Sequence, residues 1–417
     1  MNSMEIVPKK SKITEVVHNF YPEIGSAANL FFELAHELSN RYYKIRVLTM
    51  LPRHYNVADV KTIKQFEFKL YNNERINSFD VVRVKAFPAP KDSTIFRGME
   101  HFISAIQLFV VGLFSPRQDF FIVYSPPLPL AVSIILLSKI KRCKCIVNIQ
   151  DLYPQTVIDV GMLKSNFLIF LFKKMESWVY QQSDFLTVHS DKNREYVIKH
   201  GGSDEKTKTI YNWADTTLIL PERSSVFENV NLNNKFVVSY AGVLAVHQGL
   251  EVILDAAKQL EKNNDILFLL VGDGYAKEKL IKKAKDLNLN NVVFLPFQPK
   301  EKYFQVLACS DISLVCLSKD VVTPVIPGKL ISIMASSRTV VASVPLENDT
   351  GAIIKEANCG IVTESGDGIA LAHAITYLYQ NPDELTKLGL NGRRFAEENF
   401  SLKSAMTKYE EIFSLLG

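Results

Sequence analysis

Hydrophobic residues follow two alternating patterns along this chain. Short runs rich in Val, Ile, Leu and Phe are typical of buried parallel strands, and the stretches between them carry apolar residues three and four positions apart, as helices do. This alternation predicts β-α-β units and therefore an α/β fold with parallel sheets. We expect strands in the first half at 12–19, 45–50, 81–87, 120–124, 145–149 and 185–189, and in the second half at 236–240, 266–271, 292–295, 312–317, 340–342 and 359–362.

The strand expected at 81–87 alternates, and we expect Arg83 and Lys85 to point outward. The preceding residues, 52–80, are polar and carry no strong pattern.

Three helical stretches, 102–114, 128–140 and 167–172, are unusually apolar. None reaches the roughly 20 residues that span a bilayer. They are either core helices on a parallel sheet or partly exposed helices that dock on an anionic membrane surface. Basic residues flank them, as the second interpretation requires: Lys139, Lys141, Arg142, Lys144, Lys173 and Lys174.

The length of 417 residues predicts two domains. We place them at 1–215 and 236–400, with a polar linker at 216–235 and a last helix at 401–417. The composition, 47% hydrophobic and 22% charged, is that of a folded globular protein, and a net charge of +4 does not argue for nucleic acid. The five cysteines lack metal-site spacing and fit a reduced, cytosolic protein. The N-terminal residues lack the apolar core of a signal peptide, and translation could start at Met1 or Met4.

Candidate ligand-binding residues stand where predicted strands end. Asp151 follows a buried strand, where open α/β sheets bind ligands, although a helix cap or a solvated loop explains it equally well. Gly242 and Gly272 end two further strands and permit close approach of a ligand to the backbone. A Pro-Gly turn opens the helix at 329–335, whose N-terminus and Lys329 predict a diphosphate site unless this is one more ordinary turn. The turn at Gly25 lacks the three-glycine fingerprint of NAD-binding proteins.

The order of these motifs resembles that of a family 4 glycosyltransferase of the retaining GT-B type, over nearly the whole chain. The segments DLYPQ and IYNWAD are most similar to the branch that includes N-acetylfucosamine transferases of bacterial surface polysaccharides. The matching segments are YPEIGSAAN, DLYPQ, IYNWAD, YAGVLAVHQGLEVILDAA, FLLVGDGY, ACSDISLVCLS, PGKLISIMASSRTVVAS and NGRRFAEENFS.

The resemblance implies two Rossmann-like domains that face a cleft, with the acceptor in the first, the donor in the second and the last helix returning to the first. It places Asp151 beside the reacting sugar. It also implies a set of donor contacts: Gly25 and Gly242 at the phosphates, Gly272 and Asp273 near the base and ribose, and the backbone of Ile326, Pro327, Gly328, Lys329 and Leu330 around the diphosphate.

The chain departs from the family pattern at three positions. Two glutamates that the family usually carries are Pro324 and Ser332 here, and Ser332 retains a hydroxyl that can bond to the ribose. The usual lysine after the first glycine turn is His247, which is charged only part of the time near neutral pH. Lys329 is the candidate for the missing cation.

We therefore expect transfer of a sugar, with retention, from a nucleotide-diphosphate donor, most simply a UDP-linked amino or deoxy sugar. The expected acceptor is a polyprenyl-diphosphate-linked glycan, and the expected location is the cytoplasmic face of the inner membrane. No Asp-x-Asp pair stands at a strand end to hold a metal ion, so we expect no metal and no other cofactor, and we assign no protein nucleophile. The alternatives are a sugar-nucleotide epimerase on the same fold and a membrane-associated scaffold that has lost catalysis.

Overall fold

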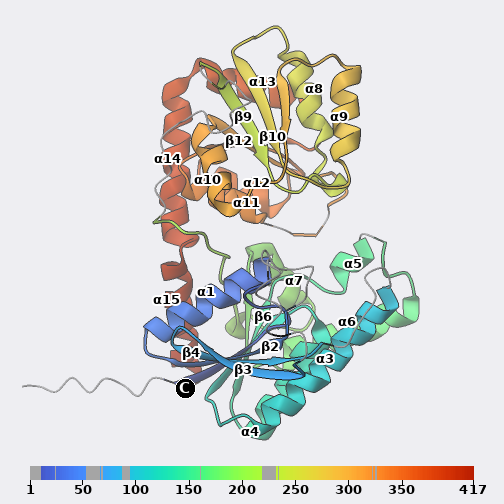
Figure 1. Cartoon of the computed structure of the whole chain (residues 1–417), viewed down its shortest axis with the longest axis vertical. Helices are drawn as coiled ribbons and strands as arrows, with labels where there is room; N and C mark the ends of the chain where they lie inside the picture. The colour runs from blue at the N-terminus through green and yellow to red at the C-terminus, as the bar shows by residue number, and fades with distance from the viewer. Residues whose placement is uncertain are drawn as a thin grey trace, which may run out of the picture. The chain divides into compact units, whose positions relative to one another are not determined.

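The computed structural model describes residues 11–23, 25–52, 66, 69–86, 94–159, 161–217, 232, 234–321, 323–324 and 326–417. The chain divides into two compact units (Figure 1). The first comprises residues 1–210 and 406–417, and the second comprises residues 211–405. Most of the linker expected at 216–235 lies outside the described residues.

The described part of the first unit contains one eight-stranded sheet, in the order β3-β4-β2-β1-β5-β6-β7-β8. Neighbouring strands are parallel except β3 and β4, which are antiparallel. The strands are β1 (Lys12–Val16), β2 (Lys44–Met50), β3 (Tyr71–Ile76), β4 (Phe79–Val84), β5 (Phe120–Ser125), β6 (Lys144–Ile149), β7 (Phe185–Val188) and β8 (Thr207–Thr209).

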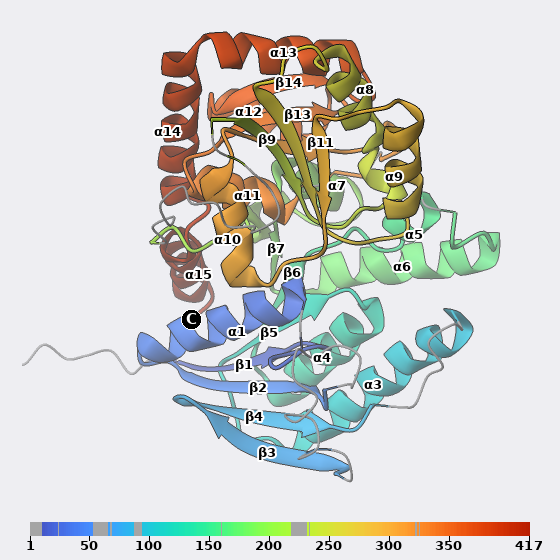
Figure 2. The same cartoon turned by 45° about the horizontal axis from the view of Figure 1, so that its top comes forward.

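Helices cover both faces of this sheet (Figure 2). One face packs the apolar residues of β1, β5, β6 and β7 against α3, α4, α6 and α7. The other receives α15, whose Tyr409 hydroxyl accepts a hydrogen bond from Asn148 Nδ2 on β6 at 3.1 Å. The helices are α1 (Ser26–Asn40), α3 (Thr94–Phe114), α4 (Leu128–Lys141), α5 (Gln155–Asp159), α6 (Asn166–Gln182), α7 (Asp191–Lys199) and α15 (Leu402–Leu416), of which 406–416 belong to this unit.

Two sequence predictions fail at the edge of this sheet. Arg83 does not point outward, because its side chain is fully buried. Its Nε lies 2.6 Å from Glu74 Oε1 and its Nη2 donates to the Tyr21 carbonyl oxygen, so the buried cation is paired. Glu74 belongs to β3, an edge strand that the weak pattern of 52–80 did not predict, because its side chains are only half-buried or exposed. Lys85, the other residue expected to point outward, lies just beyond β4, and its side chain is exposed.

The described part of the second unit contains a six-stranded parallel sheet, in the order β11-β10-β9-β12-β13-β14. The strands are β9 (Phe236–Ala241), β10 (Ile266–Val271), β11 (Val292–Leu295), β12 (Ile312–Cys316), β13 (Thr339–Val344) and β14 (Gly360–Glu364). Helices α8, α9 and α13 cover one face, and α11, α12 and α14 pack on the other (Figures 1 and 2).

The helices of this unit are α8 (Glu251–Gln259), α9 (Lys277–Asp286), α10 (Lys300–Cys309), α11 (Gly328–Ala335), α12 (Asp349–Glu356), α13 (Gly368–Gln380) and α14 (Pro382–Asn399), and a short 3-10 turn spans Val246–Gln248. Helix α12 was not predicted from the sequence. The residue from which its start could have been predicted is Asn348. The Asn348 side chain caps the helix by accepting a hydrogen bond from Thr350 N at 3.0 Å.

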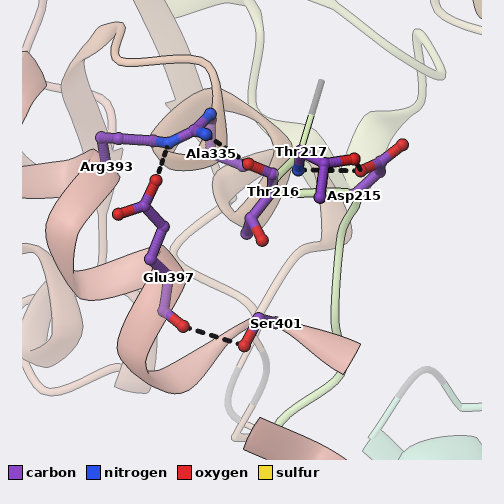
Figure 3. A network of polar contacts seen from close by, with 7 residues as sticks. All are labelled: Asp215, Thr216, Thr217, Ala335, Arg393, Glu397 and Ser401. Carbon is purple, nitrogen blue, oxygen red and sulfur yellow. Dashed lines mark hydrogen bonds and ion pairs between the residues drawn. The ribbon is translucent and has the colours of Figure 1, made fainter. Parts of the chain in front are cut away.

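A polar network joins the start of the second unit to α11 and α14 (Figure 3). Arg393 on α14 donates to the carbonyl oxygens of Ala335, at the end of α11, and of Thr216. Its Nε also lies 2.5 Å from Glu397 Oε1. Next to this network, Ala214 N donates to Phe400 O at 2.9 Å. The two stretches by which the chain enters and leaves this unit are therefore tied to each other and to α11.

The apolar stretches at 102–114, 128–140 and 167–172 fall within α3, α4 and α6. Much of α4 is core, as the first interpretation expects, whereas α3 and the start of α6 leave large apolar side chains exposed. None of the helices in the described residues is both long enough and apolar enough to cross a membrane. Across the three apolar stretches, the most exposed large apolar side chains are Phe114, Phe167, Ile106, Phe170 and Ile140.

Candidate functional site

Lys329 lies in the first turn of α11, and its side chain is folded against β9. The Nζ atom donates to Tyr240 Oη at 2.7 Å and to Gln248 Oε1 at 2.6 Å. It also stands 4.1 Å from the centroid of the Tyr240 ring, a cation–π distance. Tyr240 in turn donates to the Val243 carbonyl oxygen at 2.9 Å, so the ring is fixed. These contacts hold one cation at the mouth of a helix whose first residues have no side-chain cap.

The surroundings of Lys329 are poor in water. Burial lowers the pKa of its ammonium group to about 8, and the nearby Cys316 opposes this shift. An anion that reaches this ammonium group would restore the lost solvation and favour the charged form. The N-terminus of α11 adds its own partial positive charge. The arrangement can bind a phosphate or diphosphate, which is what the sequence predicted for Pro327, Gly328, Lys329 and Leu330.

Gly242 and Gly272 bring two loops of the second unit into direct contact. A methyl group on Gly272 would lie 1.9 Å from the Gly242 carbonyl oxygen, and one on Gly274 would lie 2.3 Å from the Leu244 carbonyl oxygen. Backbone hydrogen bonds run from Gly242 N to Val271 O and from Leu244 N to Asp273 O, both at 2.9 Å. The loop-to-loop contact alone thus accounts for glycine at position 272.

Gly242 also stands directly beside the cation. A methyl group on Gly242 would lie 3.6 Å from Lys329 Nζ. The structure therefore brings together Gly242, Gly272 and Lys329 from three separate segments of the sequence.

The other donor-site candidates of the second unit lie close to this group. The exposed Asp273 carboxylate pairs with Lys277 Nζ at 2.5 Å and accepts from Phe297 N at 2.9 Å; both contacts lower its pKa. His247 is exposed, and its carbonyl oxygen accepts a hydrogen bond from Ser318 N at 2.9 Å. Ser332, on α11, donates to the Gly328 carbonyl oxygen at 3.3 Å and lies near the Tyr303 hydroxyl.

Two residues that were not predicted from the sequence, Tyr240 and Gln248, hold Lys329. Tyr240 is at the end of β9, two residues before Gly242, and Gln248 directly precedes Gly249. The signal was a polar side chain beside each glycine turn. This signal was weak, because nothing in the sequence pairs Tyr240 and Gln248 with Lys329, which lies more than 80 residues further along the chain.

In the first unit, Asp151 follows β6 as predicted. It keeps contact with solvent, yet the protein around its carboxyl group removes part of its hydration and raises its pKa. His189, after β7, partly offsets that shift. Burial raises the pKa of Tyr124 on β5, and the Asp151 carboxyl group adds to that shift. Since β5, β6 and β7 are parallel neighbours, their carboxyl ends lie at the same edge of the sheet as Asp151. A carboxyl group of this kind can hold a proton or balance a nearby positive charge.

Gly25 precedes α1, and its positive φ of 157° favours glycine. In contrast to Gly272, a methyl group on Gly25 would meet no atom within 4 Å. Among the described residues, none therefore fills the space beside Gly25.

A cavity of about 170 Å³, partly open to solvent, lies at the same edge of the first sheet. Two imidazoles, His18 and His101, contribute to its wall, with ring centroids 5.5 Å apart. Tyr153, two residues after Asp151, forms another part of the wall, and Phe102, Pro126, Pro127, Leu128, Pro129 and Phe172 supply apolar surface. The sequence analysis named neither histidine.

In the described ranges, no three His, Cys, Asp or Glu side chains converge in a way that could hold a metal ion.

Family comparisons cover both units. The family model described as "Glycosyl transferase 4-like domain" matches residues 25–213, and the one described as "Glycosyl transferases group 1" matches residues 222–395. Together they account for most of the chain.

Curated relatives agree with this. The chain is 27% identical over 327 residues to "Probable glycosyltransferase WbjE" of Pseudomonas aeruginosa, which covers 76% of this chain and 80% of the relative. It is 24% identical over 332 residues to "Putative colanic acid biosynthesis glycosyl transferase WcaI" of Escherichia coli, covering 76% and 79%. A shorter match, 27% over 141 residues, covers 34% of this chain and 37% of the Campylobacter jejuni "N-acetylgalactosamine-N,N'-diacetylbacillosaminyl-diphospho-undecaprenol 4-alpha-N-acetylgalactosaminyltransferase".

Among solved structures, Anabaena Alr3699/HepE in complex with UDP superposes with a TM-score of 0.72. The match covers 97% of this chain and 99% of that one at 18% identity, so it speaks for the fold alone. The predicted α/β architecture of the GT-B type is thereby confirmed. The chain belongs to the family 4 glycosyltransferases.

Proposed function

We propose that this glycosyltransferase moves a sugar from a nucleotide-diphosphate donor to a lipid-linked glycan acceptor, with retention, in the synthesis of a bacterial surface polysaccharide. The observation that carries the donor half is Lys329, held by Tyr240 and Gln248 at the N-terminus of α11 and beside Gly242. This arrangement offers one positive charge and the helix terminus to one anion.

The chemistry follows from that charge. As the bond between sugar and diphosphate breaks, negative charge grows on the leaving diphosphate. Donors that are already oriented toward that charge stabilise the transition state more than the ground state. Lys329 and α11 would provide this stabilisation, so the proposal requires no metal. Ser332 would bond to the ribose in place of the family's glutamate.

A UDP donor is favoured by the names of relatives and neighbours. The solved HepE structure contains UDP, and the Campylobacter relative transfers an N-acetylated amino sugar. We therefore propose a UDP-linked amino or deoxy sugar for this chain.

The acceptor half of the proposal places a lipid-linked glycan on the first unit. The Campylobacter relative acts on a diphospho-undecaprenol-linked glycan, and the WcaI relative is named for colanic acid biosynthesis. In this chain, exposed Phe114, Phe167 and Phe170 together with Lys173 and Lys174 would dock the unit on an anionic membrane surface.

Asp151 would position the acceptor or balance the cationic sugar. The carboxyl group stands at the sheet edge where β5, β6 and β7 end, two residues from the Tyr153 cavity wall. Replacement Asp151→Asn keeps the shape and removes the negative charge, so turnover should fall about 100-fold. Intact turnover would remove Asp151 from the mechanism.

The donor proposal is tested by thermal unfolding of the full chain with UDP, GDP, dTDP and ADP. A nucleotide at 100 times its dissociation constant adds roughly 2.7 kcal/mol, which raises Tm by roughly 5–10 °C. We expect a selective shift with UDP that Lys329→Ala strongly reduces. If none of the four nucleotides raises Tm, the result would favour a scaffold that has lost catalysis.

A further inference from the structure

An apolar groove runs along the helices of the first unit, away from the Tyr153 cavity. It has a volume of about 390 Å³, is partly open to solvent, and lies between α3 and α4. Its wall includes Phe102, Ile106 and Phe109 from α3 and Pro129, Val132 and Leu136 from α4. Ser133 is the one hydroxyl-bearing wall residue in the described chain, and its hydroxyl donates to Leu130 O at 2.8 Å. The groove thus presents hydrocarbon to whatever enters it.

The groove borders the cavity that contains the two imidazoles. Phe102 and Pro129 belong to the walls of both. The Phe172 ring, in the wall of that cavity, lies 6.5 Å from the Phe102 ring and 5.3 Å from the Tyr153 ring. A lipid whose polar head lies near Tyr153 would therefore have an apolar groove beside it for its hydrocarbon chain.

Charge around the groove has one sign. In residues 98–114, 128–141 and 166–182 the acidic residues are Glu100 and Glu176, and both are buried. The lysines on these segments include the exposed Lys139, Lys173 and Lys174. A groove between helices whose exposed charges are lysines is complementary to a lipid with a phosphate head.

We propose that this groove binds the hydrocarbon chain of the lipid-linked acceptor, so that the enzyme selects its acceptor by the chain as well as by the glycan. The inference rests on the proposed acceptor class and adds a binding site for the lipid. Each methylene that leaves water for an apolar wall strengthens binding about fourfold, so affinity should rise steeply with chain length.

The test uses three soluble probes with the full chain: inorganic diphosphate, geranyl diphosphate and farnesyl diphosphate, titrated by calorimetry. The readout is the gain in affinity from one probe to the next longer one, which we call the chain-length increment. A diphosphate held at Lys329 contributes equally to all three probes and so does not affect it. We expect farnesyl diphosphate to bind at least about tenfold more tightly than geranyl diphosphate. Equal affinities of the three probes would overturn the proposal.

Two matched variants locate the site. Ile106→Asp puts a carboxylate in the groove wall, and Phe114→Asp puts one on the same helix outside the wall. Both positions are exposed, at 63% and 87%, so neither change should disturb folding. We expect Ile106→Asp to abolish the chain-length increment and Phe114→Asp to keep it while weakening binding to anionic vesicles. Equal loss of the increment in both variants would mean that the hydrocarbon chain meets the exposed face of α3 in general and not the groove, against the proposal.

The result for the lipid groove can be told apart from the result for the donor proposal. The UDP-dependent rise in Tm reports on the second unit and should be unchanged in Ile106→Asp. A missing chain-length increment with an intact UDP shift overturns the groove alone. A chain-length increment without any UDP shift supports the groove and counts against the donor.

Discussion

The two candidate sites of this protein are built in opposite ways. In the second unit, loops that follow β9 and β10 are joined backbone to backbone at Gly242 and Gly272, and one lysine is fixed by two polar partners. In the first unit, the cavity at Tyr153 and the groove beyond it are walled mainly by rings and aliphatic side chains.

This contrast matches two kinds of ligand. A diphosphate needs a charge and dipoles in fixed positions, which rigid glycine loops and a helix terminus supply. A hydrocarbon chain needs only surface removed from water, which tolerates many shapes. The second unit should therefore be sensitive to small changes of geometry, and the first to changes of polarity.

The largest expected effect is on the loop contact of the second unit. Gly272→Ala would place its methyl group against the Gly242 carbonyl oxygen and strain a positive φ, which should cost about 3 kcal/mol of unfolding free energy. Urea denaturation measures this. Gly328→Ala is the control, because a methyl group there meets no atom within 4 Å and stability should change by less than about 0.5 kcal/mol. Similar losses in both variants would contradict the rigid-loop description.

A smaller effect is expected from Lys329→Met, which keeps the unbranched, flexible form of the side chain, one atom shorter, and removes its charge. Loss of a charge-assisted hydrogen bond to the diphosphate should weaken UDP binding about 30-fold, or about 2 kcal/mol. Calorimetric titration gives the affinity directly. Lys279→Met, at an exposed position on α9, should leave it unchanged. Unaltered UDP affinity in Lys329→Met would place the diphosphate elsewhere.

The protonation state of Lys329 predicts that the affinity for UDP depends on pH. Its pKa in the free protein is lowered to about 8, and a bound diphosphate favours the charged form. Below pH 8 the site is already charged, whereas above it each binding event must take up a proton. UDP affinity should fall about tenfold between pH 7 and pH 9, and Lys329→Met should flatten that profile. A fall of the same size in the variant would assign the titration to another group.

The smallest effect concerns a buried carboxyl group in the first unit. Glu15 on β1 is fully buried, its carboxylate oxygens have no hydrogen-bond partner in the described part of the chain, and burial raises its pKa well above the ordinary 4.5. As pH rises past the unfolded pKa, only the unfolded state loses its proton easily, so unfolding free energy falls with rising pH. Glu15→Gln should remove that fall and add about 1 kcal/mol at pH 8, with little change at pH 4.

The control for Glu15 is Glu195→Gln at an exposed position of α7. Chemical denaturation at the two pH values gives both differences. Equal stabilisation at pH 4 and pH 8 would show that the charge of Glu15 is not the cause.

Local patterns predicted most of the fold. Runs such as ILFLLV form β10 because a strand covered on both faces must be apolar throughout, and that requirement is visible in the sequence. Helix α11 was predicted from the spacing of its apolar residues and from Pro327-Gly328. Where burial depends on a distant partner, the same reasoning failed. Arg83 alternates like an outward residue, yet Glu74 and the Tyr21 carbonyl oxygen pair it inside the protein.

The sequence by itself determined the class of fold, its division into two α/β halves, and the position of α11 with Lys329 at its first turn. These features depend on periodicity, glycine and proline, which act over a few residues. Only the tertiary structure decided that Tyr240 and Gln248 hold Lys329, that Gly272 must be glycine because of Gly242, and that one face of α3 stays uncovered as the wall of a groove. Each of these depends on which distant surfaces meet, and a pattern of single residues contains no record of its partners.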